Sequence, residues 1–155
     1  MPKAKQAKEN DKREFQKKYM QYQIAQQYAA ALAEEKAALE AKLAELSMTS
    51  ASMLSLKKIR QGEEIWSALG SDVFVMSDIK DISTAIVGVG AGVYVRKPLD
   101  EAVKTIEARR AELAEAEQQL TAEMAALGEQ FARLEPELQA MAAQLQGEEK
   151  EAEKK

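Results

Sequence analysis

A heptad pattern in the last third of the chain constrains the fold more than any other feature. Six heptads predict a long coiled-coil helix over about 99–146. Its core positions alternate steps of three and four residues without a slip: Val103, Ile106, Arg110, Leu113, Glu117, Leu120, Met124, Leu127, Phe131, Leu134, Leu138, Met141 and Leu145. Charged residues at two of these positions reduce stability or fix the register.

The first third of the chain carries a matching pattern and predicts a helix over 11–60. One row is apolar, with Ala25, Leu32, Leu39, Leu46 and Met53, and its companion row is mixed, with Phe15, Tyr22, Ala29, Lys36, Leu43 and Ser50. Basic residues at 57, 58 and 60 suit the end of a helix, and Gly62 can terminate it.

The two helices are predicted to pair as an antiparallel coiled-coil hairpin. Each is about 70 Å long, and the two equal lengths together with a compact link between them favour this pairing. Residues whose numbers add to roughly 160 are then expected at similar heights along the hairpin. The charged tails, 1–10 and 147–155, are expected to be disordered.

The middle segment, 63–97, changes from helix-forming to strand-forming residues. Short runs rich in Val, Ile and aromatic residues alternate with turn residues such as Gly70-Ser71-Asp72. They predict four strands and three turns, arranged as two β-hairpins in series.

Composition excludes most kinds of chemistry. The chain has no His and no Cys, so the commonest general base and the thiolate ligands of zinc are missing. Asp78 and Asp81 are the closest acids in the middle segment, and a solvated turn explains them better than a catalytic pair does. We expect no enzymatic activity, no cofactor and no metal.

Charge and hydropathy also exclude several partners and locations. The net charge of −4 gives no electrostatic footprint for nucleic acid. No apolar run is long enough to cross a membrane, and we expect no secretory signal because the polar N-terminal residues include no apolar h-region. We therefore expect a cytoplasmic protein that binds neither nucleic acid nor membrane.

The glycines at Gly88, Gly90 and Gly92 raise the question of a phosphate-binding loop. Such a loop is followed by a helix, whose N-terminus receives the phosphate. Here the residues that follow are strand-forming, from Val93 onward. The cluster, like Gly70, is predicted to form a hairpin turn.

The hairpins hold more apolar surface than one thin coiled coil can cover. The residues expected to form this surface are Trp66, Phe74, Val75, Ile79, Ile86, Val87, Val89, Val93 and Val95. Isolated hairpins are marginally stable, and their edges pair with other strands. We expect several copies to assemble through this segment into a shared barrel or sandwich.

The far ends of the helices carry apolar residues beyond those that the seam needs. Tyr19 and Met20 lie off both heptad rows, so apolar surface is expected to remain exposed there. Gly128 and Pro136 fall in the distal half of the second helix. They are either a tolerated bend on its outer face or a device that lets the tip splay.

The arrangement of helix, two hairpins and helix resembles prefoldin subunits of the archaeal α class. The most specific stretch is 63–102, with Leu69-Gly70, Ile79-Lys80-Asp81, the run Val87 to Gly92, and the strand leading to Leu99. Two hairpins fit the α class, because β-class subunits carry one. Trp66, Ser67, Pro98 and the Ser- and Met-rich stretch 48–55 depart from the family pattern.

The resemblance implies an ATP-independent holdase, a hexamer of two α and four β subunits on a platform of two β-barrels. Its coiled-coil tips would capture unfolded proteins and pass them to a group II chaperonin. The expected tip residues are Phe15, Tyr19, Met20, Tyr22, Phe131, Leu134, Leu138, Met141 and Leu145. Two other hypotheses are a self-assembling, filament-forming structural protein and a nucleic-acid-binding arm that uses its basic N-terminal tail.

Overall fold

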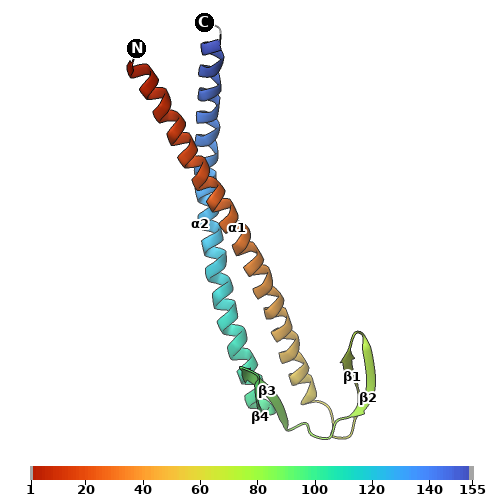
Figure 1. The fold of residues 1–155 in the computed structure, drawn as a ribbon. Coiled ribbons are helices and arrows are strands. Elements are labelled where there is room, and N and C mark those ends of the chain that lie inside the picture. The colour runs from red at the N-terminus through yellow and green to blue at the C-terminus, as the bar shows by residue number, and fades with distance from the viewer. Residues whose placement is uncertain (1, 154–155) are drawn as a thin grey trace. The chain divides into compact units, whose positions relative to one another are not determined.

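The computed structural model describes the backbone of residues 2–153 and the side chains of residues 9–147. The elements follow one another as α1 (Pro2–Leu56), β1 (Glu64–Gly70), β2 (Val73–Asp78), β3 (Thr84–Gly90), β4 (Val93–Pro98) and α2 (Leu99–Glu153) (Figure 1). The predicted order of helix, two hairpins and helix is confirmed. The chain divides into two compact units, Met1–Ala38 with Glu117–Lys155, and Leu39–Ala116.

Helix α1 differs from the prediction at both ends. Helical backbone already covers residues 2–10, where Ala, Lys, Gln and Glu favour a helix. The helix ends at Leu56, because the amides of Lys58 and Ile59 donate to carbonyl oxygens three residues back and tighten the chain into turns. Gly62, with φ of +88°, lies in the link to β1 and does not close the helix.

Helix α2 is continuous from Leu99 to Glu153. Its first turn carries Asp100 and Glu101, which complement the positive end of the helix dipole. Gly128 and Pro136 both lie inside the helix and are exposed, and neither ends it.

The ends of both helices overlap the tails that composition predicts to be disordered. Helical backbone covers residues 2–10 and 147–153. Residues 1 and 154–155, and the side chains of 1–8 and 148–155, lie outside the described residues. The disorder of these tails stays a prediction.

In the unit built from Met1–Ala38 and Glu117–Lys155, α1 and α2 pack along the predicted heptad seams. The buried residues are Leu32, Leu120, Leu127 and Leu138. Contacts across the seam, such as Lys18 with Glu137 and Tyr28 with Glu123, join residues whose numbers add to slightly less than 160. The antiparallel pairing of these helix segments is confirmed.

In the unit Leu39–Ala116, the two helix segments share a core with the second hairpin. Its buried members are Leu46, Met53, Val87, Leu99, Ala102 and Ile106. Lys57 pairs with Asp100 beside this core, and the salt bridge lowers the pKa of the Asp100 carboxyl.

One predicted seam position in this unit is wrong. Arg110 is exposed and pairs with Glu107 at 2.7 Å, whereas its neighbour Arg109 is partly buried. The reason is the hairpin β3–β4, which covers a further face of α2. The Arg109 guanidinium donates a hydrogen bond to the carbonyl oxygen of Gly88 in β3.

The two hairpins are tandem copies with an offset of twenty residues. Strands β1 and β3 have seven residues each, and β2 and β4 have six each. Gly70 and Gly90 both have φ of 109°, and each lies at a break in the regular pairing just before its turn. The matching positions are Gly70 and Gly90, Val73 and Val93, Phe74 and Tyr94, and Val75 and Val95.

Candidate binding groove and assembly surface

An apolar groove, which we call the tip groove, opens between α1 and α2 in the unit built from Met1–Ala38 and Glu117–Lys155. Its volume is about 350 Å³. The lining residues are Phe15, Tyr19 and Tyr22 from α1 and Glu135, Leu138, Gln139 and Ala142 from α2. Four of the predicted tip residues, Phe15, Tyr19, Tyr22 and Leu138, therefore line one cavity.

Aromatic pairs form the wall of this tip groove on the α1 side. The rings of Phe15 and Tyr19, one helical turn apart, stack with centroids 6.0 Å apart and planes 16° apart. The ring of Tyr22 meets Phe131 edge-on, at 5.3 Å and 76°. Offset stacks and edge contacts are the favoured aromatic geometries. Each aromatic residue that lines the groove thus also contacts another ring.

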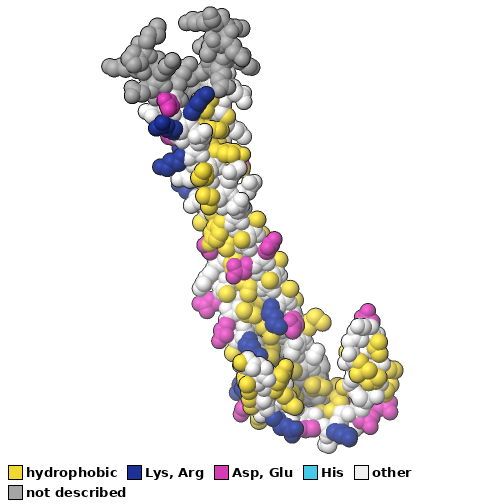
Figure 2. Space-filling view, viewed as in Figure 1, with side chains coloured by type: hydrophobic (Ala, Val, Ile, Leu, Met, Phe, Trp, Pro, Cys, Tyr) yellow, Lys and Arg dark blue, Asp and Glu magenta, His cyan; other side chains and the backbone are white. Residues whose placement is uncertain are grey.

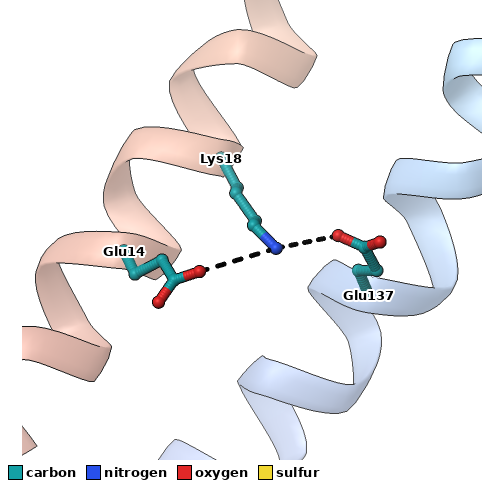
Figure 3. Close-up of polar contacts among 3 residues, drawn as sticks. All are labelled: Glu14, Lys18 and Glu137. Atoms are coloured by element: carbon teal, nitrogen blue, oxygen red, sulfur yellow. Dashed lines mark hydrogen bonds and ion pairs between the residues drawn. The ribbon is translucent and has the colours of Figure 1, made fainter.

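Polar contacts join α1 and α2 beside the tip groove. The Tyr22 hydroxyl donates to Glu135 at 2.7 Å, and this hydrogen bond raises the pKa of Tyr22. Lys18 Nζ lies 2.8 Å from a Glu137 carboxylate oxygen and 3.7 Å from Glu14 (Figure 3). The hydrogen bond between Lys18 and Glu137 raises the pKa of Lys18 and lowers that of Glu137.

A second cavity, of about 450 Å³, lies in the same unit. It is lined by Gln21, Ala25, Gln130, Arg133 and Leu134. Ala25 is small for a seam position, and the missing side-chain volume leaves space between the helices. This cavity accounts for a fifth predicted tip residue, Leu134.

The other predicted tip residues lie outside both cavities. Phe131 packs against Tyr22, and Met141 and Leu145 are half-buried on α2. Met20 is 62% exposed. Sequence reasoning missed three groove residues, Glu135, Gln139 and Ala142, because polar and small side chains give no apolar signal.

The second candidate site is the apolar surface of the hairpins (Figure 2). Seven of the nine predicted assembly residues are exposed in the single chain: Trp66, Phe74, Val75, Ile86, Val89, Val93 and Val95. The other two, Ile79 and Val87, are buried within the chain and are unavailable to a partner. Sequence reasoning missed four further exposed apolar side chains, Leu69, Val73, Met76 and Tyr94.

The glycines of the two hairpins have two different roles. Gly70, Gly90 and Gly92 have positive φ, and β4 follows the second turn where a phosphate loop needs a helix. Gly88 lies inside β3, directly opposite Tyr94. A Cβ atom on Gly88 would come within 3.2 Å of the Tyr94 ring. The three glycines with positive φ allow the backbone of the turns, and Gly88 allows the Tyr94 ring to lie close to β3.

The described residues contain neither a cluster of metal-ligating side chains nor a membrane-spanning helix. No group of three or more His, Cys, Asp or Glu side chains there is placed to hold a metal ion. Neither helix, over its described length, has a stretch apolar enough to cross a membrane.

Among solved structures, the chain is similar to filamentous PFD from Methanocaldococcus jannaschii, determined by cryo-EM. The TM-score is 0.66 at 24% identity, and the match covers 75% of this chain and 96% of the other. At this identity the likeness concerns the fold alone.

Sequence comparison identifies relatives named prefoldin subunit alpha. The one from Methanopyrus kandleri is 33% identical over 75 residues, 48% of each chain, so the match spans about half of that relative. The one from Pyrococcus horikoshii is 34% identical over 101 residues, 64% of this chain and 68% of the relative. The one from Methanothrix thermoacetophila is 28% identical over 109 residues, 70% and 69%.

A family model matches more than half of the chain. The model described as "Prefoldin subunit" covers residues 25–144, which include both hairpins and most of the seam positions. The chain belongs to the prefoldin subunit family.

Proposed function

We propose that the chain is the α subunit of an ATP-independent holdase that captures unfolded proteins at its coiled-coil tips. The observation that carries the proposal is the tip groove, an apolar cavity of about 350 Å³ walled by Phe15, Tyr19 and Tyr22. Unfolded chains expose the apolar side chains that such a groove can shield from water. The remaining predicted tip residues extend the apolar surface along the same helices. The proposal needs no catalytic group and no cofactor.

The hairpin surface supports assembly of several subunits. Trp66, Ile86 and Tyr94 are each about two-thirds exposed in the single chain. Large apolar side chains left exposed together on one element mark interaction sites on proteins. The proposed assembly is a hexamer of two α and four β subunits, in which the hairpins form the barrels of a platform.

Assembly would also explain how a small groove can hold a client. One groove gives a weak contact, whereas several grooves on one platform raise the effective affinity by multivalency. Weak individual contacts would allow release to a group II chaperonin in the cytoplasm.

The test compares groove variants with a matched surface variant. Tyr19→Gln with Ala142→Gln makes the groove polar, and Met48→Gln makes the same kind of change at an exposed site on α1, off the seam. Each purified chain, alone and with an archaeal prefoldin β subunit, is mixed with a test protein diluted from guanidinium chloride. Light scattering then reports aggregation of that protein without ATP.

We expect the groove variant to lose most of the suppression of aggregation, and Met48→Gln to retain it. Circular dichroism should show equal helix content in all three proteins. Full suppression by the folded groove variant would contradict the tip groove as the client site.

A second candidate function is a self-assembling filament. The observation that favours it is the presence on one chain of two hairpins that both carry exposed apolar side chains, together with the fold likeness to filamentous PFD. Multi-angle light scattering of the chain alone separates the two functions. Long polymers support the filament, and a small species that becomes a hexamer with β subunits supports the holdase.

A further inference from the structure

The tip groove holds a single charged side chain among its aromatic and apolar lining. Glu135 of α2 is the only residue of the described lining that is charged at neutral pH. The Tyr22 hydroxyl donates to one oxygen of Glu135 at 2.7 Å. This neutral donor satisfies one oxygen and leaves the negative charge of the carboxylate in place. The groove is therefore apolar in shape and anionic in charge.

No cation in the described part of the chain neutralises Glu135. Lys18, on the facing helix, is shared between Glu137 at 2.8 Å and Glu14 at 3.7 Å (Figure 3). Arg133 is two positions from Glu135 on α2, and residues two apart on a helix do not face each other. Arg133 lines the second cavity and not the tip groove. Among the described residues, Glu135 thus forms no ion pair.

The unpaired charge decides which side chains the groove can accept at low cost. An occupant of the 350 Å³ cavity displaces water from its lining. Removing water from a carboxylate costs free energy unless a charged or hydrogen-bonding partner replaces the water. An aliphatic side chain offers no such partner, and an anionic one is repelled. A cationic side chain compensates the carboxylate.

The aromatic lining favours the same kind of occupant. The stacked rings of Phe15 and Tyr19 lie on the α1 side of the groove. The faces of aromatic rings attract cations, and arginine makes this contact more often than lysine. Arginine also covers apolar surface with its aliphatic stem while its head group stays polar. Its guanidinium can stack on a ring and donate to a carboxylate at the same time.

We propose that the tip groove selects polypeptide segments in which an arginine or lysine lies between apolar residues, and that Glu135 sets this selectivity. The cationic head group would lie against the rings of the groove and donate to the Glu135 oxygen that Tyr22 does not use. The apolar neighbours would contact the apolar lining, which includes Leu138. This inference rests on the proposed holdase function and states which segments of a client the groove prefers.

The test uses the full chain and two short peptides that differ in one charge. Each peptide consists of Gly and Ser around a central Leu-Arg-Leu or Leu-citrulline-Leu, and both carry the same dye. Citrulline has nearly the shape of arginine but is neutral. Fluorescence anisotropy measures binding to wild type, to Glu135→Gln and to Glu129→Gln. Glu129 is exposed on α2 outside both cavities, so its variant is a control with the same change in net charge.

We expect wild type and Glu129→Gln to bind the arginine peptide about fivefold more tightly than the citrulline peptide, as one partly exposed ion pair allows. Glu135→Gln should bind the two peptides equally. It should also bind the citrulline peptide at least as tightly as wild type does, because its amide still accepts from Tyr22 and costs less to desolvate.

Three results would overturn the inference. The first is equal binding of the two peptides by wild type. The second is a preference for arginine that persists in folded Glu135→Gln or is lost equally in Glu129→Gln, since either would assign it to the general charge of the chain. The third is weaker binding of both peptides by folded Glu135→Gln, which would mean that Glu135 only shapes the groove.

The groove variant separates this inference from the proposed function. If Tyr19→Gln with Ala142→Gln loses suppression of aggregation while wild type binds both peptides equally, the holdase function stands and the selectivity fails. If that variant suppresses aggregation fully while the preference for arginine depends on Glu135, the groove fails as the client site and stands as a site for basic segments. If wild type neither binds a peptide nor suppresses aggregation, both fail.

Discussion

Lys36 Nζ lies 2.7 Å from a carboxylate oxygen of Glu117, at positions where both helices otherwise direct apolar side chains toward each other. Both side chains are about one-quarter exposed. The hydrogen bond from Lys36, assisted by one from Thr121, lowers the pKa of Glu117. The charged positions in the two heptad seams are thus matched across the coiled coil, and the match favours one alignment of the helices over slipped alternatives.

Charge reversal tests this role of Lys36 and Glu117. Lys36→Glu alone places two carboxylates together at the seam, and Glu117→Lys alone places two ammonium groups there. Each single variant should melt at a lower temperature than wild type, and the swapped double variant should recover most of the loss. Thermal unfolding followed by circular dichroism measures the coupling. Additive losses in the double variant would show that the pair does not set the register.

The second turn offers a test of backbone geometry. Ala91 has φ of 48°, a left-handed backbone conformation. This conformation costs a residue with a Cβ atom about 1 kcal/mol. Ala91→Gly should therefore raise the free energy of unfolding by up to about that amount. Gly90 has φ of 109°, so Gly90→Val should strain the turn and impair assembly. Thermal melts and light scattering measure both effects. Normal assembly of Gly90→Val would contradict the role of the turn.

Arg109 should anchor the second hairpin to α2. Its guanidinium donates to the carbonyl oxygen of Gly88, and Val87 beside Gly88 is buried in the core. Arg109→Met keeps most of the aliphatic stem but loses the hydrogen bond, which should cost about 1–2 kcal/mol. Amide hydrogen exchange should become faster in β3 and β4, while β1 and β2 serve as the internal control. Unchanged protection of β3 would contradict the anchor.

The link between the hairpins should be sensitive to acid. Asp81 accepts hydrogen bonds from the amide and hydroxyl of Ser83 and from the hydroxyl of Thr84, and these bonds lower its pKa to about 2. A carboxyl with a lowered pKa stabilises the folded state above its ordinary value of 3.8, and loses this contribution as the pH falls toward 2. Exchange of the Ser83 amide should accelerate over that window.

Asp81→Asn is the matched variant for the acid prediction. It keeps one acceptor oxygen but cannot titrate, so exchange of the Ser83 amide should be faster at neutral pH and independent of pH between 4 and 2 once the intrinsic rate is corrected. A midpoint for Asp81 near its ordinary pKa in the wild-type chain would show that the turn does not hold the carboxylate.

The seams and hairpins could be predicted because their signals are periodic along the sequence. Phe15 and Tyr22 share a heptad row, so their place between the helices follows from spacing alone. The two faces of a strand are harder to tell apart when both are apolar. For this reason the sequence does not distinguish Val87, which is buried within the chain, from the exposed apolar residues of β3. Ile79 follows β2 in the link between the hairpins and is also buried, which no strand pattern predicts.

Contacts that join distant segments gave no local signal. The approach of the Tyr94 ring to Gly88 depends on the register of β3 with β4, and the hydrogen bond of Arg109 depends on which face of α2 the hairpin covers. The uncharged run 19–33 is visible in the sequence, but its position relative to the seam depends on which face of α1 meets α2.

The twenty-residue repeat has a consequence for the stoichiometry of the proposed assembly. In polymer chemistry, a subunit with two hairpins that can each pair with another subunit is a bifunctional monomer, and a subunit with one such hairpin ends the growth of the chain. Bifunctional units alone keep adding to one another. Under the proposed function, the supply of one-hairpin partners would therefore decide whether this chain ends in a closed particle or in an open fibre.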